Sequence, residues 1–290
     1  MKSNISAGCL YIVATPIGNL QDLGRRAEEV LRQVDGIVCE NTRNSQKLLQ
    51  HYGISTPCIG KITDHQGERE VQKIVDKMLL GATLAYISDA GTPGVSDPGM
   101  TLVACAHAAG LLVVPVPGPS AVTTALSAVG FVATPWIFLG FFPEKSGPRK
   151  AEAQAINERA CATVFFESPH RIEKTRQALH ASLEPTRRVG IVREVTKMYE
   201  QVWVGEAKEL GVLGKEVPVK GEFTIVVEGR GRGEAKDSQD LLACTTRKLM
   251  RAMVRQGMTG KQIVGVLQEV GGGSKNHIYQ TYLAMMESEE

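Results

Sequence analysis

Apolar residues follow two different patterns along the first half of the chain. Short runs that are apolar throughout alternate with longer stretches in which apolar positions recur every three or four residues. The first pattern is typical of strands buried on both faces, and the second is typical of amphipathic helices. This alternation predicts an α/β domain over residues 1–133, with a mainly parallel sheet covered on both faces. The predicted strands are 9–15, 36–40, 57–63, 82–88 and 111–116, and the predicted helices are 23–34, 45–52, 68–80, 98–109 and 121–129.

The second half has a different order of elements. Only two helices separate its early strands and the later strands follow one another through short links, so a mixed or antiparallel sheet is expected. We assign this sheet to a second α/β domain at 134–232. The polar, glycine-containing stretch 230–237 indicates a linker, and 237–290 is predicted to be a helical tail. The expected strands are 136–142, 162–167, 188–195, 200–204 and 222–228, and the expected helices are 150–160, 171–182, 241–256, 259–270 and 274–286.

One loop stands out because it joins a buried strand to a helix through an unusual concentration of glycine and proline. It lies within the stretch 84–99, LAYISDAGTPGVSDPG. Gly91 and Gly94 allow backbone angles or close approaches that a β-carbon would prevent, and Asp97 followed by Pro98 predicts a helix start. Open α/β sheets bind small molecules at this end of their strands. The alternative is a well-specified turn without chemistry.

Composition changes this picture little. Hydrophobic residues make up 43% of the chain and charged residues 22%, as in ordinary soluble globular proteins. The six cysteines are scattered without a Cys-x-x-Cys pair, and the histidines form no metal-binding set, so no metal site is expected. The apolar run 9–14 is too short for a signal peptide core or a membrane span. We therefore expect a soluble, cytoplasmic protein.

Positive charge is concentrated in the predicted tail. From Thr245 to Lys275 there are six basic residues and one acidic residue, although the whole chain has a net charge of only +2. Arg247, Arg251 and Arg255 recur every four residues and would form one row on a helix, which we call the arginine stripe. Such a row is often only a solvated face. Here the local charge excess and the preceding linker favour a surface that binds phosphates.

Polar residues recur at the ends of the predicted strands rather than on helix faces. No nucleotide-binding Gly-x-x-x-x-Gly-Lys-Ser/Thr loop, no Gly-x-Gly-x-x-Gly after a strand and no Gly-x-Ser-x-Gly elbow is present. The recurrence of polar residues in one topological position favours a binding cleft. These residues are Asn19, Asp22, Glu40, Arg43, Asp89, Ser120, Glu167, His170, Arg171, Arg193, Glu194 and Lys197.

Seven strings in this order, spread over nearly the whole chain, carry a resemblance to a known family. They are LYIVATPIGNLQD, ISDAGTPGVSDPG, PGPSA, GFFP, FFESPHR, REVTKMYE and GEFTIVVEG. Together they resemble the RsmI branch of the tetrapyrrole methylase superfamily. The resemblance implies an S-adenosylmethionine-dependent enzyme that methylates the 2'-oxygen of a cytidine in 16S rRNA of the small ribosomal subunit. It also implies a homodimer.

The same resemblance implies a cofactor site in the cleft between the two α/β domains. We expect RNA contacts from Arg43, Arg171 and Arg193 as well as from the arginine stripe. The implied cofactor residues are Pro16, Asp89, Ala90, Gly91, Val95, Ser120, Ala121, Phe166, Glu167, Phe223 and Thr224.

Three residues are candidates for assisting the reaction. A ribose hydroxyl is a poor acid, so a nearby base or cation would help to make its oxygen nucleophilic. Glu167, Glu194 and Lys197 each stand at a strand end that is predicted to face the cleft. The alternative is a salt-bridge network among Glu194, Lys197 and Arg193.

Two departures from the family pattern leave roles open. Asn41 stands where the family commonly has aspartate in Glu-Asp-Thr-Arg, and Asp64–Glu68 replaces a His-Asn-Glu pattern. Both segments are otherwise interpreted as loops that connect a strand to a helix. Two other functions are also considered, a porphyrin or corrin C-methyltransferase and a ribosome-binding factor without catalysis. The helical tail argues against the first, and the intact loops at Pro16, Gly91 and Ser120 argue against the second.

Overall fold

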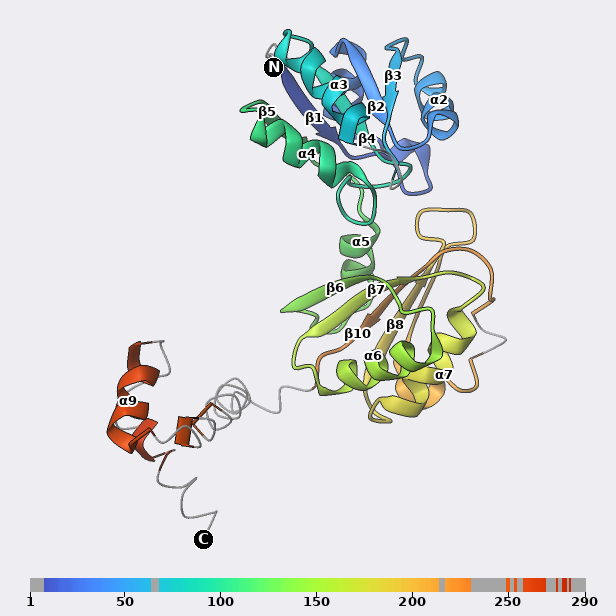
Figure 1. Cartoon of the computed structure of the whole chain (residues 1–290). Coiled ribbons are helices and arrows are strands. Elements are labelled where there is room, and N and C mark those ends of the chain that lie inside the picture. Colours follow the sequence, from blue (N-terminus) through green and yellow to red (C-terminus); the bar gives the residue numbers. More distant parts are fainter. Residues whose placement is uncertain are drawn as a thin grey trace. The chain divides into compact units, whose positions relative to one another are not determined.

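The chain divides into two compact units, Met1–Glu228 and Gly229–Glu290. The first unit contains two sheets, and the predicted boundary at residue 133 falls between helix α5 (Ala121–Ala128) and strand β6 (Trp136–Phe141) (Figure 1). The computed structural model describes residues 8–63, 68–213, 217–230, 249–250, 253–254, 258–269, 275, 278–280 and 282.

The first sheet is formed by β1 (Cys9–Val13), β2 (Gly36–Cys39), β3 (Cys58–Lys61), β4 (Leu84–Ile87) and β5 (Leu112–Val116). Its strand order is β3-β2-β4-β1-β5, and all neighbouring strands are parallel, which confirms the predicted parallel sheet. Successive residues point to opposite faces. Tyr11 therefore joins the cluster under α1 (Arg25–Gln33) and α2 (Thr42–His51), whereas Leu10 joins the cluster under α3 (Glu68–Leu79) and α4 (Gly99–Ala108).

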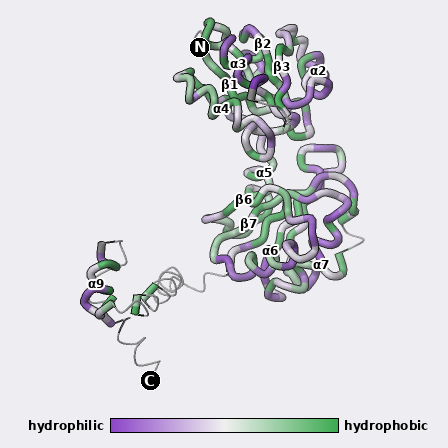
Figure 2. The backbone as a smooth tube through the Cα atoms, in the orientation of Figure 1, coloured by the Kyte–Doolittle hydropathy of each residue, from purple (hydrophilic) through white to green (hydrophobic). Residues whose placement is uncertain are grey.

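The second sheet is formed by β6, β7 (Ala162–Glu167), β8 (Arg188–Arg193), β9 (Gln201–Glu206) and β10 (Phe223–Val227). Its order is β6-β7-β10-β8-β9, with β6 and β7 parallel and the other pairs antiparallel, so the expected mixed sheet is confirmed. Helices α6 (Ser146–Glu158) and α7 (Ile172–Ser182) cover one face. Helix α5 covers the other through Val122, Ala125 and Val129. In Figure 2 the inner strands of both sheets carry hydrophobic colouring along much of their length.

In the first unit, α1, α4 and α7 begin one or two residues later than predicted, whereas α2 and α6 begin three and four residues earlier. Asn19 caps a short 3-10 turn at Leu20–Asp22 by accepting a hydrogen bond from the backbone of Gln21, so α1 begins only after Gly24. Helix α4 begins at Gly99 rather than Pro98. The predicted capping role of Asp97 is nevertheless retained, because its carboxylate accepts a hydrogen bond from the backbone of Gly99 at 2.9 Å.

The second unit contains α9 (Gly260–Glu269), which matches the predicted helix at 259–270. Gln262 accepts hydrogen bonds from the backbone and hydroxyl of Thr259, and this fixes the start of the helix. Met250, Ile263, Val264, Leu267 and Ile278 form a small apolar cluster. The flanking predicted helices lie largely outside the described residues, as do Arg247, Arg251 and Arg255. Within the described part of the chain, no helix is long and apolar enough to cross a membrane.

Candidate active site

The glycine-rich loop after β4 is tied to two other loops. Gly91 has φ of +80° and Gly94 has φ of +88°, which are angles that favour glycine. Gly91 exchanges two backbone hydrogen bonds with Thr15, of 2.9 and 3.1 Å, and the hydroxyl of Thr92 donates to the carbonyl of Pro119 at 2.9 Å. The loops that follow β1, β4 and β5 are therefore joined into one rigid edge.

Asp97 holds the loop in shape from inside. Its carboxylate accepts hydrogen bonds from the backbone of Gly94 at 2.6 Å and of Gly99 at 2.9 Å, and from the hydroxyl of Tyr86 at 3.3 Å. Burial, together with the nearby charge of Asp97, raises the pKa of Tyr86, so the phenol stays protonated and acts as a donor. The loop that sequence analysis interpreted as specified is held by one carboxylate and by backbone contacts.

A pocket of about 450 Å³ opens beside this loop, within the size range of small-molecule sites. One wall comes from the loops of the first sheet and the other from the strand ends of the second. The lining residues are Ile17, Glu40, Ser88, Asp89, Ala90, Gly91, Thr92, Val95, Ser96, Asp97, Ser120, Ala121, Phe141, Phe166, Glu167, Ser168, Pro169, Val192, Val195, Glu222, Phe223 and Thr224.

Ten of the eleven predicted cofactor residues line this pocket, and Pro16 is the exception, with its neighbour Ile17 in its place. Phe141 and Glu222 are not among the predicted site residues, although they lie within the quoted strings GFFP and GEFTIVVEG. Asp97 was predicted only to cap a helix. The quoted strings could have indicated that these residues lie near the site. Only the structure shows which residues of each string face the pocket.

The first-sheet wall is acidic. Glu40 accepts a hydrogen bond from the backbone of Asp89 at 2.9 Å, and the amide of Asn44 donates to the carboxylate of Asp89 at 2.8 Å. Asn41, the departure from the family pattern, caps α2 by accepting a hydrogen bond from the backbone of Arg43 at 3.1 Å. Aspartate and asparagine both serve as N-caps, so this substitution preserves the local structure. The second departure lies mostly outside the described residues.

Glu167 lines the pocket, but both of its carboxylate oxygens already accept hydrogen bonds from the protein. Oε1 accepts from the backbone of Ser168 at 2.7 Å and from Nε of Arg171 at 2.8 Å, and Oε2 accepts from the hydroxyl of Thr175 at 2.6 Å. The side chain is buried. These contacts favour a positioning role for Glu167 over the predicted role as a base.

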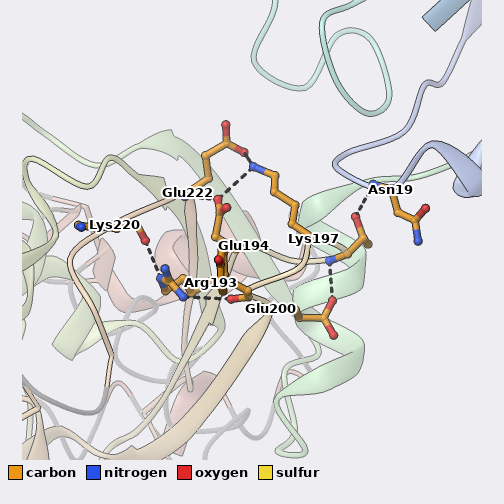
Figure 3. Close-up of polar contacts among 9 residues, drawn as sticks. Asn19, Arg193, Glu194, Lys197, Glu200, Lys220 and Glu222 are labelled. Carbon is orange, nitrogen blue, oxygen red and sulfur yellow. Dashed lines mark hydrogen bonds and ion pairs between the residues drawn. The ribbon is translucent and has the colours of Figure 1, made fainter. Parts of the chain in front are cut away.

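Glu194 and Lys197 do not line the pocket and form an ion-pair network instead (Figure 3). Nζ of Lys197 lies 3.0 Å from Glu194 and 2.9 Å from Glu222, which does line the pocket. The alternative of a salt-bridge network is thus confirmed for Glu194 and Lys197, with Glu222 as the third member in place of Arg193.

The environment of this network shifts two pKa values in opposite directions. Burial alone would raise the pKa of Glu194, but hydrogen bonds from the backbone of Glu222 and from Lys197 lower it. Burial alone would lower the pKa of Lys197, but the carboxylates of Glu222 and Glu194 raise it. Glu194 and Lys197 are therefore held in their charged forms near neutral pH.

The segment carrying this network, residues 194–200, has a strained backbone. Glu194 and Thr196 have φ of +48° and +66°, which non-glycine residues adopt at a cost of about 1–3 kcal/mol each. Thr196 is held by a backbone hydrogen bond to the carboxylate of Glu200, and its hydroxyl accepts from the backbone of Asn19 at 3.1 Å. A β-carbon at Gly18 would lie 2.4 Å from the Lys197 side chain. The segment therefore docks closely on the first loop.

The predicted RNA-contacting arginines differ in their surroundings. Arg43 is exposed at the start of α2. Arg171 is partly exposed, and its guanidinium lies 5.9 Å from the ring centre of Phe141. Arg193 is buried and donates to the carbonyls of Lys220 and Tyr199, which favours a structural role over RNA contact. Across the described ranges, no group of three or more potential metal ligands is found.

The fold defines the class of protein. It is shared with a cobalt precorrin-4 methyltransferase (TM-score 0.55, 17% identity, covering 76% of this chain and 95% of that one). It is also shared with the uroporphyrin-III C-methyltransferase of Thermus thermophilus (TM-score 0.53, 19% identity, covering 77% and 94%). The family model described as Tetrapyrrole (Corrin/Porphyrin) Methylases matches residues 9–211.

The chain belongs to this methylase family, and within it to the group named ribosomal RNA small subunit methyltransferase I. The relative in Haemophilus influenzae is 40% identical, over 97% of this chain and 98% of the relative. Relatives in Vibrio cholerae and Bacillus subtilis are 39% and 35% identical, over 94% and 95% of this chain and 94% of each relative. The resemblance found in the seven strings is thereby confirmed.

Proposed function

We propose that this protein transfers a methyl group from S-adenosylmethionine to the 2'-oxygen of a cytidine in 16S rRNA of the small ribosomal subunit. The observation that carries this proposal is the pocket beside the glycine-rich loop, lined by ten residues that the family resemblance implies for the cofactor. The relatives, named for methylation of small-subunit rRNA, support the substrate class. The alternative function is that of a corrin or porphyrin C-methyltransferase. The two solved structures with that function named above are less than 20% identical to this chain, so they support the fold alone.

The residues of the pocket fit this cofactor. S-adenosylmethionine carries a sulfonium and an ammonium group, and the first-sheet wall carries Glu40, Asp89 and Asp97. Opposite charges attract strongly in a partly desolvated site. Val95 and Phe166 supply apolar surface, and the bare backbone of Gly91 allows close approach. When bound, the cofactor supplies an electrophilic methyl group.

The protein's main contribution would be alignment, because methyl transfer is an in-line displacement and orientation accounts for much of its rate. The loops tied through Thr15, Gly91 and Thr92 would hold one reactant. A carboxylate at the rim would accept the proton of the ribose hydroxyl. We propose Glu222 for this, because it lines the pocket with a side chain 80% exposed, and Lys197 fixes it at 2.9 Å.

Two further proposals concern partners. The tail at 237–290 would contact RNA through the arginine stripe, supported by its local excess of positive charge. A homodimer would form through the second sheet. In support, Val202 and Val204 are exposed on one side of β9, an edge strand of that sheet. Exposed apolar edge strands are prone to pair with another chain.

The test is incubation with radiolabelled S-adenosylmethionine and small ribosomal subunits, followed by mapping of the label. We expect one labelled cytidine, modified on the ribose. The Glu222→Gln variant keeps the shape of the side chain but removes its charge, and it should lower kcat by about 100-fold or more. Absence of label in the rRNA with the unaltered protein would overturn the proposal, and label on a base would overturn the assignment to the ribose oxygen.

A further inference from the structure

We propose that Phe141, supported by Arg171, is the surface on which a base of the RNA substrate stacks while its ribose is methylated. This inference rests on the proposed function and adds a substrate-binding residue to it. The ring of Phe141 lines the pocket and is still 56% exposed. Its neighbour Phe142 points the other way, is buried, and stacks on Phe165 with ring centres 4.5 Å apart.

An irregularity in the strand directs Phe141 toward the pocket. In a regular strand, residues three positions apart point to opposite faces. The pairing of β6 with β7 shifts register between Phe138 and Phe141, and Gly140 has φ of +69°. As a result the rings of Phe138 and Phe141 both contact the ring of Phe166 edge-on, with distances between ring centres of 4.9 and 5.7 Å. Bulges of this kind commonly re-aim a side chain next to an active site.

A cation over the ring also holds it in position. The guanidinium of Arg171 lies 5.9 Å from the centre of the Phe141 ring, within the range of a cation–π contact. Arg171 is itself fixed by Glu167 at 2.8 Å and by the hydroxyl of Ser168 at 3.1 Å. Glu167 therefore acts by fixing Arg171, the arginine that contacts the ring.

The chemistry of this wall matches an unstacked base. Proteins bind single-stranded or extruded bases by stacking them on aromatic rings and arginine planes. The opposite wall carries Glu40, Asp89 and Asp97, which would attract a cationic donor and repel phosphate. The acidic first-sheet wall therefore suits the cationic donor, and the exposed ring of Phe141 on the other wall suits the nucleotide.

The test compares three variants of the full chain. Phe141→Ala removes the ring, Phe141→Tyr keeps a ring, and Trp136→Ala removes an aromatic that is 41% exposed on the same strand but does not line the pocket. Stacking on one base implies a rise in KM for small ribosomal subunits of roughly 5- to 150-fold for Phe141→Ala. Phe141→Tyr and Trp136→Ala should both keep the KM of the unaltered protein.

Calorimetry with S-adenosylmethionine separates this role from cofactor binding, because the Kd of Phe141→Ala should stay close to that of the unaltered protein. A raised cofactor Kd with an unchanged KM for RNA would assign the ring to the cofactor and overturn the inference. An unchanged KM in all variants would do the same. Thermal unfolding checks that the variants fold.

The failure of the proposed function is distinguishable from the failure of this inference. Without methylation of rRNA by the unaltered protein, the proposed function fails. Binding of a fluorescein-labelled single-stranded RNA still decides the stacking role, since Phe141→Ala should weaken it and Phe141→Tyr should not.

Discussion

Replacing Gly91 by valine is expected to weaken S-adenosylmethionine binding at least tenfold while leaving a folded protein. Gly91 stands at the junction of the three loops that form the first-sheet wall, with φ of +80°. A β-carbon there would lie 3.2 Å from Cγ2 of Ile17 and 3.6 Å from the carbonyl oxygen of Pro119. The two methyl groups of valine would therefore be forced between loops that both border the pocket.

The expected size of the effect has two parts. A left-handed backbone costs a residue with a β-carbon about 1–2 kcal/mol, and this part acts on stability alone. The second part acts on the site, because relief of the 3.2 Å contact displaces Ile17 or breaks the paired hydrogen bonds to Thr15. A displacement approaching 1 Å in a site can lower a reaction rate about 100-fold. We therefore expect the affinity for S-adenosylmethionine to fall at least tenfold, which is about 1.4 kcal/mol.

Calorimetric titration with S-adenosylmethionine measures the loss, and denaturant unfolding measures stability. Gly110→Val is the matched control, because Gly110 has φ of +70° at the far end of α4 and a β-carbon there meets nothing within 4 Å. Both variants should lose similar stability, but only Gly91→Val should lose affinity. If Gly91→Val fails to fold, Gly91→Ala takes its place. Equal cofactor affinity in the Gly91 variant and the unaltered protein would refute the reasoning.

Three other predictions follow from the structure and the sequence. Lys197→Met should lower the free energy of unfolding by about 1–2 kcal/mol near neutral pH. Because the pKa of Glu194 is lowered, its stabilising contribution is present above the ordinary carboxyl pKa and is lost as pH falls through the lowered value, so this difference should shrink below about pH 4 in denaturation curves. Light scattering at micromolar concentration should give twice the chain mass of 31.3 kDa, and Val204→Lys should shift it toward the single-chain mass. Replacing the arginine stripe by alanine should flatten the salt dependence of small-subunit methylation without changing cofactor affinity, and an unchanged slope would remove the tail as the RNA contact.

The sequence predicted the sheets well because their strands are set by local patterns. Buried strands such as Leu84–Ile87 are apolar throughout and are bounded by turn residues, so their positions and the parallel class follow from the pattern. Helix starts were less predictable. Asp22 has the chemistry of an N-cap, but Asn19 caps a short turn just before it and delays the helix to Arg25. Competing caps within a few residues cannot be ranked without the tertiary structure.

The candidate site shows the same division between local and non-local information. The cofactor residues were accessible to sequence analysis because they lie in motifs with unusual glycine and proline spacing. The roles of Glu167 and Arg193 were not, since they depend on partners from other segments, such as Thr175 and Lys220. The orientation of Phe141 was also hidden, because a strand pattern does not reveal a bulge.

The two walls of the pocket are held in different ways. The glycine-rich loop is fixed by backbone hydrogen bonds between Thr15 and Gly91 and by one carboxylate, Asp97. Backbone contacts place few demands on side chains, so this wall can tolerate substitution of its side chains. The opposite wall carries exposed side chains such as Phe141 and Glu222, which substitution can change without disturbing the sheet. Substitutions that change which substrate this protein accepts are therefore expected on the second-sheet wall.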